Sequence, residues 1–454
     1  MIHNRTIFNE INGEINKDNN KIIILIGARQ VGKTTIMKYF FKKLKEKKQK
    51  TIFLDLDIYS NYEKVETYEK FINYLTINWY KKEENENCKK QNKYSEEQNE
   101  YFQKQSEYLE EQSEYSREQN NYYYVFLDEF QRYDNFTKIL KNIYDNNKNI
   151  KIIASWSSSI NIKNNIQESL AWRKRIINIF PLNYEEFLLF KWAQNLYKNY
   201  KNIKNITWSD LYPSLKEYYD LLYEFMIYWW YPAVVLENNF EEKQKILWDI
   251  FDLFIKKDLW EYLKIDKIKI VKDILKYIAI NNWSKLKYEE ISKISNVSIH
   301  TIKNYVEILK ELFIFIELKP YFKNKNLELV KIPKIYFIDN WVRNYFIKNF
   351  IEIDLRNDNW ALFEWYIIWE FLKSKVDIES LKYWNHKNKK EVDIIIDNIS
   401  SLDSYEVKFK KNIKSKDLSW LKVFWEMYKV KWNLINLWIK SKNDKYNFIL
   451  PFGL

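Results

Sequence analysis

Short apolar runs alternate with helical stretches through the first 180 residues of the chain. Each run has about five consecutive residues rich in Ile, Val, Phe and Tyr, the composition of a strand buried on both faces. The stretches between the runs have the pattern of helices, as in Lys33–Lys47. This alternation predicts an α/β fold with strands at Ile22–Ile26, Thr51–Asp55, Tyr122–Gln131, Lys151–Ser155 and Ile176–Phe180.

The second half of the chain predicts mostly helices and then a smaller α/β segment. Residues 221–236 and 243–263 predict a lid-like helical segment, and three shorter helices follow between 267 and 312. An apolar helix at 360–373 then precedes three strand-like runs, at 381–385, 391–396 and 404–409. We therefore expect four domains, at 1–200, 201–264, 265–345 and 346–454.

Residues 81–121 interrupt the α/β pattern with a polar repeat. The repeat carries a tyrosine at every seventh position, which would align the tyrosines on one stripe of a helix. We expect an inserted, mostly helical and solvated arm, with disorder as the alternative. The tyrosines are Tyr94, Tyr101, Tyr108, Tyr115 and Tyr122.

Composition narrows the class of protein. A single cysteine, Cys88, excludes a disulfide framework and a Cys-rich zinc site. No apolar run reaches the roughly 18 residues needed to span a bilayer, and the N-terminus lacks an apolar signal segment. We expect a cytoplasmic protein with no membrane partner. The net charge of +12 favours nucleic acid only weakly, because the lysines are spread along the chain.

Glycine and tryptophan depart from ordinary usage. The chain has 4 glycines and 19 tryptophans, whereas glycine usually makes up about 7% of residues. Several tryptophans lie at turns and element ends, where glycine is favoured because it adopts positive φ. One hypothesis is that most of them are glycines, encoded by UGA in a lineage that reads this codon as glycine. The alternative is a genuinely Trp-rich protein. Trp384 has the sequence context of a true tryptophan.

The eight residues GARQVGKT follow the first strand and match the phosphate-binding loop pattern G-x-x-x-x-G-K-[ST]. In this motif the backbone amides surround the phosphates, the lysine (Lys33) contacts the β- and γ-phosphates, and the hydroxyl of Thr34 binds Mg²⁺. ATP and Mg²⁺ are therefore the expected ligands. The expected nucleotide-binding residues are Gly27, Ala28, Arg29, Gln30, Val31, Gly32, Lys33, Thr34 and Thr35.

Polar residues at the ends of later strands complete the expected site. The run YYYVFLDEFQ ends in acids of the Walker B type, in which Asp128 would hold Mg²⁺ and Glu129 would activate water. Ser155 ends the next strand and Ser157 follows it, and both would contact the γ-phosphate or the attacking water, or else form an ordinary turn. Arg173 is a candidate arginine finger, with a surface or packing role as the alternative.

These motifs together resemble the prokaryotic predicted ATPases of the AAA+ superfamily. The resemblance rests on GARQVGKT, VFLDEFQ, ASWSSS, SLAWRKR followed by FPLNYEEF, and WWYPAVV, in this order. It implies an AAA-type core followed by a C-terminal region of unknown function. The family has glycine at the positions of Trp156, Trp172, Trp229, Trp230 and Trp341, which supports the recoding hypothesis.

Residues 288–312 have the pattern of a helix-turn-helix, with Ser298 as the N-cap of the second helix. Strands at 313–320 and 334–338 would complete a winged helix. Such a module binds DNA, here through Ser298, His300, Thr301 and Lys303, or serves as a protein contact.

The last segment resembles the PD-(D/E)xK nuclease fold. Asp393 lies on one predicted strand and E-x-K, formed by Glu406 and Lys408, lies on the next. The resemblance implies that Asp393 and Glu406 hold Mg²⁺ while Lys408 steadies the nucleophile or the scissile phosphate. Glu364 would add an acid from the preceding helix. Folds of this kind also serve as inactive binding modules.

The sequence thus predicts a Mg²⁺-dependent ATPase with an AAA-type α/β core, a winged helix and a nuclease-like C-terminal domain. We expect it to act as a nucleotide-driven switch on a DNA, RNA or protein partner. The alternatives are an ATP-gated DNA or RNA nuclease and a nucleotide-sensing DNA-binding regulator. The sequence leaves the oligomeric state open.

Overall fold

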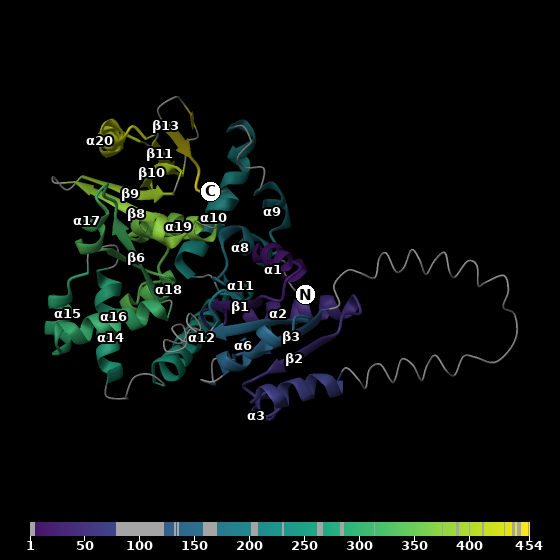
Figure 1. Ribbon diagram of the computed structural model, residues 1–454. Helices are drawn as coiled ribbons and strands as arrows, with labels where there is room; N and C mark the ends of the chain where they lie inside the picture. Colours follow the sequence, from purple (N-terminus) through teal and green to yellow (C-terminus); the bar gives the residue numbers. More distant parts are fainter. Residues whose placement is uncertain are drawn as a thin grey trace, which may run out of the picture. The chain divides into compact units, whose positions relative to one another are not determined.

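A computed structural model gives the fold, and the chain divides into two compact units (Figure 1). The first comprises Met1–Ala28 and Gly32–Ile179, and the second comprises Arg29–Val31 and Phe180–Leu454. The structure describes residues 5–78, 122–130, 133, 136–157, 170–200, 208–228, 231–260, 267–281, 286–312, 314–374, 376–386, 390–398, 400–410, 413–430, 432–437, 441–442, 446–452 and 454. The arm predicted at 81–121 lies outside these residues.

The first unit is built on a five-stranded sheet with the order β2-β3-β4-β1-β5, and all the strand pairs are parallel. This confirms the predicted α/β fold of this half. The strand β4 lies between β1 and β3, so it is buried on both faces along its whole length. The strands are β1 (Ile22–Gly27), β2 (Thr51–Asp55), β3 (Tyr123–Asp128), β4 (Ile150–Ser157) and β5 (Lys174–Asn178).

Helix α2 connects β1 to β2 and helix α6 connects β3 to β4, as crossovers between parallel strands require. An apolar cluster from β1, β3, β4 and α6 forms one core of the unit, which includes Leu127, Leu140 and Ile152. Because parallel strands end at a common edge, the carboxyl ends of β1, β3 and β4 come together there. The helices of this unit with assigned bounds are α1 (Ile7–Asn16), α2 (Lys33–Glu46), α3 (Tyr59–Tyr62) and α6 (Phe136–Asn146).

The second unit begins with helices. A helix-turn-helix is present as predicted: Asn296 takes a left-handed backbone (φ 52°) after α15, and the Ser298 hydroxyl accepts a hydrogen bond from the amide of Thr301 to cap α16. The helices are α8 (Tyr184–Phe190), α9 (Gln194–Tyr200), α10 (Trp208–Tyr228), α11 (Pro232–Leu236), α12 (Phe240–Leu253) with the π-helical turn η2 (Phe254–Leu259), α14 (Ile268–Ile280), α15 (Tyr288–Ser295) and α16 (Ile299–Glu311).

A mixed eight-stranded sheet forms the rest of the second unit, in the order β12-β13-β11-β10-β9-β8-β6-β7. The predicted wing strands β6 and β7 pair with each other, and β6 also pairs with β8, so the hairpin belongs to this sheet. The winged helix and the domain boundaries stay predictions. The strands are β6 (Phe315–Pro320), β7 (Lys334–Phe337), β8 (Leu381–His386), β9 (Lys390–Asp397), β10 (Leu402–Lys408), β11 (Trp432–Asn436), β12 (Ser441–Lys442) and β13 (Tyr446–Ile449).

Helix α19 is buried along most of its length. Every residue from Ala361 to Leu372 is buried, and the helix packs against β10 and α10. Its apolar character on all sides explains this burial. The remaining elements are α17 (Lys325–Val330), α18 (Asn340–Ile347), η4 (Ile353–Leu355), α19 (Asn359–Lys373), η5 (Ile378–Ser380), η6 (Ser415–Leu418) and α20 (Ser419–Tyr428). Among the helices in the described part of the chain, none is long and apolar enough to cross a membrane.

Candidate functional site

The loop GARQVGKT connects the end of β1 to the start of α2. Two of its residues have left-handed backbones, Gln30 (φ 60°) and Gly32 (φ 96°). At Gly32 a side chain would meet open space, so glycine is required by the backbone angle and not by crowding. The loop therefore turns tightly onto the N-terminus of α2, where free amides favour an anion.

Lys33 is buried at the first position of α2. Its ammonium donates hydrogen bonds to the carbonyl oxygens of Gly27 (3.0 Å) and Ala28 (2.9 Å). The positive charge thus lies against the loop itself, and its contact with phosphates stays a prediction. Thr34 and Thr35 follow in the first turn of the helix, and Thr35 is exposed.

Asp128 and Glu129 reach the same edge of the sheet at the end of β3. The Asp128 carboxylate is buried and accepts hydrogen bonds from the hydroxyls of Thr34 and Ser155. Burial raises the pKa of Asp128, and these two hydrogen bonds partly offset the effect. The two side chains expected to share Mg²⁺, Thr34 and Asp128, therefore already touch, so the donor set fits the ion.

Ser155 and Ser157 both contact the acids of β3. The Ser155 hydroxyl also accepts a hydrogen bond from the amide of Glu129 (3.0 Å). The Ser157 hydroxyl donates to the Glu129 carboxylate (2.8 Å). Glu129 itself has a left-handed backbone (φ 55°), a strained conformation of the kind found at functional sites. The two serines thus form one hydrogen-bonded group with the two acids.

Arg173 lies at the edge of the sheet opposite to the phosphate loop, and its role as an arginine finger stays a prediction. It precedes β5, which runs parallel to β1, and its main-chain oxygen accepts a hydrogen bond from Ile22 at the start of β1. Its guanidinium binds both carboxylate oxygens of Asp145, at 2.8 and 3.1 Å. An arginine-finger role toward a neighbouring chain stays a prediction.

The tryptophans fall into two groups. Trp172 and Trp192 have left-handed backbones (φ 67° and 59°) and exposed side chains, which is where glycine is favoured. Trp156 and Trp341 are buried and their φ angles are not positive. Trp384 packs edge-on against Phe424, as a true tryptophan would. Trp229, Trp230 and Trp283 lie outside the described residues. The recoding hypothesis stays a prediction.

The four residues of the nuclease-like motif come together in the second unit. Strands β9 and β10 are antiparallel neighbours, which brings Asp393 beside Glu406 and Lys408. The Lys408 ammonium lies 2.5 Å from Glu406 Oε1 and 3.9 Å from Asp393 Oδ2, and the amide of Val407 donates to the same Asp393 oxygen (2.8 Å). Lys408 therefore holds the two carboxylates together.

Glu364 reaches this cluster from α19. Its buried carboxylate accepts a hydrogen bond from the hydroxyl of Tyr336 (2.7 Å). Burial raises the pKa of Glu364 to about 7. Burial also raises the pKa of Glu406, and the nearby charge of Asp393 adds to this effect.

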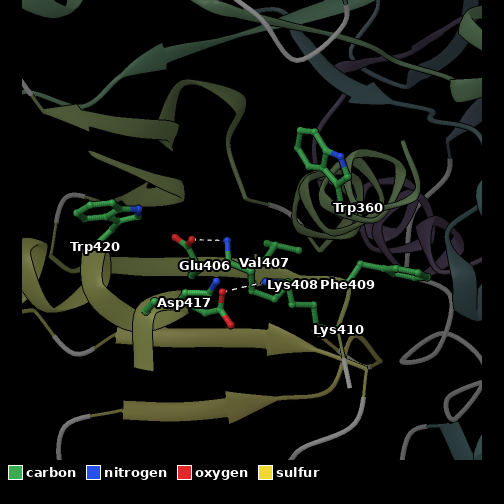
Figure 2. Close-up of a pocket in the computed structure, with 9 residues that line it drawn as sticks. Trp360, Glu406, Val407, Lys408, Phe409, Lys410, Asp417 and Trp420 are labelled. Atoms are coloured by element: carbon green, nitrogen blue, oxygen red, sulfur yellow. Dashed lines mark hydrogen bonds and ion pairs between the residues drawn. The ribbon is translucent and has the colours of Figure 1, made fainter. Parts of the chain in front are cut away.

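A pocket of about 310 Å³ opens beside Glu406 (Figure 2). The second carboxylate oxygen of Glu406, Oε2, is buried without a hydrogen-bond partner. This orphaned oxygen fits a site that receives a cation. However, no three Asp, Glu, His or Cys side chains in the described part of the chain are arranged as a ready metal centre. The pocket is lined by Glu406, Lys408, Lys410, Lys416, Asp417 and Trp420, with Trp360, Val407 and Phe409.

Sequence reasoning missed three members of this cluster: Lys334, Tyr336 and Glu391. Lys334 and Tyr336 lie on β7, and their acidic partners are 28 to 57 residues away in the chain. No local motif could have found them. The helix-turn-helix residues His300 and Lys303 are exposed, and the ring nitrogen Nδ1 of His300 lies 3.4 Å from the side-chain amide of Asn304.

The loop, the paired acids and the parallel strand order define a P-loop type of domain. A family model described as an AAA domain matches residues 19–94 and 66–188. Two further models, both domains of unknown function (DUF8612 and DUF4143), match residues 219–351 and 361–450. Residues 19–188 are thus similar to an AAA domain, and two later regions are similar to domains of unknown function.

Curated relatives carry no described activity. An uncharacterized protein of Methanocaldococcus jannaschii is 28% identical over 287 residues, and one of Haemophilus influenzae is 26% identical over 230 residues. These matches cover 60% and 49% of this chain. The chain spans 58% and 52% of the two relatives' lengths. A Walker-type ATPase of Pyrococcus abyssi is 18% identical, with a TM-score of 0.46 over 76% of this chain and 96% of that one.

Proposed function

We propose that this protein binds and hydrolyses ATP with Mg²⁺ and acts as a nucleotide-driven switch on a protein or nucleic-acid partner. The observation that carries the proposal is the hydrogen-bonded group at the end of the sheet. It joins Thr34 of the phosphate loop to Asp128, Ser155, Glu129 and Ser157. Two adjacent acids beside a glycine-containing loop are not required to stabilise a sheet, so this arrangement supports a catalytic role.

Each residue has a distinct task in this proposal. The amides of residues 28–32 and the ammonium of Lys33 bind the phosphates of ATP. The Thr34 hydroxyl and the Asp128 carboxylate would hold Mg²⁺, which neutralises charge on the phosphates. Glu129 orients the attacking water and accepts its proton, while Ser157 holds the Glu129 carboxylate.

The test is ATP turnover by the purified protein. Lys33→Ala should lower phosphate release roughly a hundredfold or more, because it removes the cation that binds the phosphates. Glu129→Gln should keep nucleotide binding and lower turnover by roughly the same factor. Lys38→Ala is the matched control, because Lys38 is an exposed lysine on the same helix. Unchanged turnover in Lys33→Ala would refute the proposal.

A second candidate function is Mg²⁺-dependent cleavage of DNA or RNA by the C-terminal domain. The observation that favours it is the meeting of Glu364, Asp393, Glu406 and Lys408, with Glu406 Oε2 left without a partner. Asp393 and Glu406 would hold the metal, which would activate water or stabilise the phosphate. Asp393→Asn should abolish cleavage, while Asp403→Asn, on the neighbouring strand, should not. Cleavage that survives Asp393→Asn would exclude this site.

A further inference from the structure

A second buried lysine belongs to the C-terminal acidic cluster. Lys334 lies on β7, and its ammonium forms an ion pair with Glu391 and lies 3.8 Å from Glu364 Oε1. Its side chain is 9% exposed. A buried lysine is stabilised only by such partners, so Lys334 is bound to this cluster.

Tyr336 approaches the same carboxylate from the same strand. Residues 334 and 336 point to one face of β7, because side chains alternate along a strand. The Tyr336 hydroxyl donates to Glu364 Oε1 at 2.7 Å, and its ring stacks on Trp365. Two groups of β7 therefore hold one oxygen of Glu364.

The cluster as a whole is short of positive charge. It contains four carboxylates, Glu364, Glu391, Asp393 and Glu406, against the two lysines Lys334 and Lys408. The carboxylates thus outnumber the lysines, and Glu406 Oε2 is buried without a hydrogen-bond partner. A divalent cation would supply that partner, and the ion pair of Lys334 with Glu391 keeps Glu391 from competing for the cation.

We propose that Lys334 and Tyr336 are positioning residues of the C-terminal cation site. They fix Glu364 and engage Glu391, so that the cation binds at Asp393 and Glu406. This inference rests on the second candidate function above. Under this inference the site is formed by residues from two regions of the chain. Strand β7 lies within residues 219–351, and the acids and Lys408 lie within residues 361–450.

The experiment measures Mn²⁺ binding by the full-length protein without nucleotide. The Mn²⁺ binding that is present in the wild type and lost in the Asp393→Asn variant is assigned to this site. Tyr336→Phe should weaken that binding about tenfold, the effect expected for one hydrogen bond to a charged group. Lys334→Met should weaken it at least as much, and Lys334→Arg should restore most of it.

Tyr366→Phe is the matched control. Tyr366 lies on α19 two residues after Glu364, and its buried hydroxyl donates to the carbonyl of Pro451, not to an acid (2.9 Å). Circular dichroism verifies that each variant is folded, and Tyr336→Phe decides the matter if Lys334→Met does not fold. If the wild type binds no Mn²⁺ at Asp393, the second candidate function fails. If it binds and Tyr336→Phe binds as tightly as Tyr366→Phe, the positioning inference alone is overturned.

Discussion

The hydroxyl of Ser157 donates a hydrogen bond of 2.8 Å to the carboxylate of Glu129. This contact follows from the strand order, because β4 lies between β1 and β3. Ser157 is paired in register with Gly27, the first residue of the phosphate loop. One serine thus connects the phosphate loop's strand to the acid proposed to activate water.

Ser157→Ala should lower the turnover number for ATP roughly tenfold, because the Glu129 carboxylate loses the donor that orients it. The KM for ATP should change little. Steady-state phosphate release measures both quantities. Ser157→Thr, which keeps a hydroxyl, is the control. A raised KM with unchanged turnover would mean instead that Ser157 binds the nucleotide.

Trp172→Gly should raise the free energy of unfolding by about 1 kcal/mol in protein made with the printed sequence. The reason is that Trp172 is 92% exposed and has a left-handed backbone, which only glycine adopts without strain. Urea unfolding measures the change. Trp156→Gly is the contrast: it should lower stability by about 3 kcal/mol, because Trp156 is buried against Phe130.

The recoding hypothesis has a separate test. The intact mass of the protein from its own cells should be lower than the printed sequence requires, because each glycine lacks the indole group. A mass that agrees with 19 tryptophans would exclude the hypothesis.

Glu370 should make stability depend on pH. It is buried, accepts a hydrogen bond from the amide of Tyr184 (3.0 Å), and burial raises its pKa from 4.5 to about 7. The folded protein therefore binds a proton that the unfolded chain releases, so this group's contribution to stability falls as the pH rises from 4.5 to 7.

Glu370→Gln should remove this contribution, because the amide stays neutral and still accepts from Tyr184. The loss of stability between pH 5 and pH 8 should shrink by about 2 kcal/mol. Urea unfolding at several pH values measures it, with the exposed Glu217→Gln as control. An equally steep pH dependence in Glu370→Gln would contradict the assignment.

Arg173→Ala should leave ATP turnover unchanged at protein concentrations where the chain is monomeric. Its guanidinium is bound to Asp145 at the far edge of the sheet. Phosphate release across a range of protein concentrations is the measurement. If turnover rises with concentration in the wild type and not in Arg173→Ala, the arginine serves a neighbouring chain's site.

The phosphate loop was predictable because its chemistry is local. Eight consecutive residues, GARQVGKT, supply the amides, the lysine and the hydroxyl, and the flanking strand and helix are visible in the apolar pattern. The acids of β3 were predictable for the same reason, since a buried strand that ends in Asp128 and Glu129 is a short motif. The partners of the two serines were not, because strand order decides them.

The sequence left the role of Arg173 open between an arginine finger and a surface or packing residue. In the structure Arg173 precedes β5, and a residue that precedes a parallel strand lies at the opposite edge from one that follows it. The edge at which a residue lies depends on the direction in which its strand runs within the sheet. The sequence pattern alone does not give that direction.

The order of residues along the chain was enough to identify an α/β domain with a phosphate loop, a threonine expected to bind Mg²⁺ and an acid pair, because each of these is made by neighbours in sequence. The packing of strands and helices determined the rest: Ser157 against Glu129, Arg173 against Asp145, and Lys334 and Tyr336 against Glu364. Those contacts join residues 28 or more positions apart, so they exist only after the strands have packed.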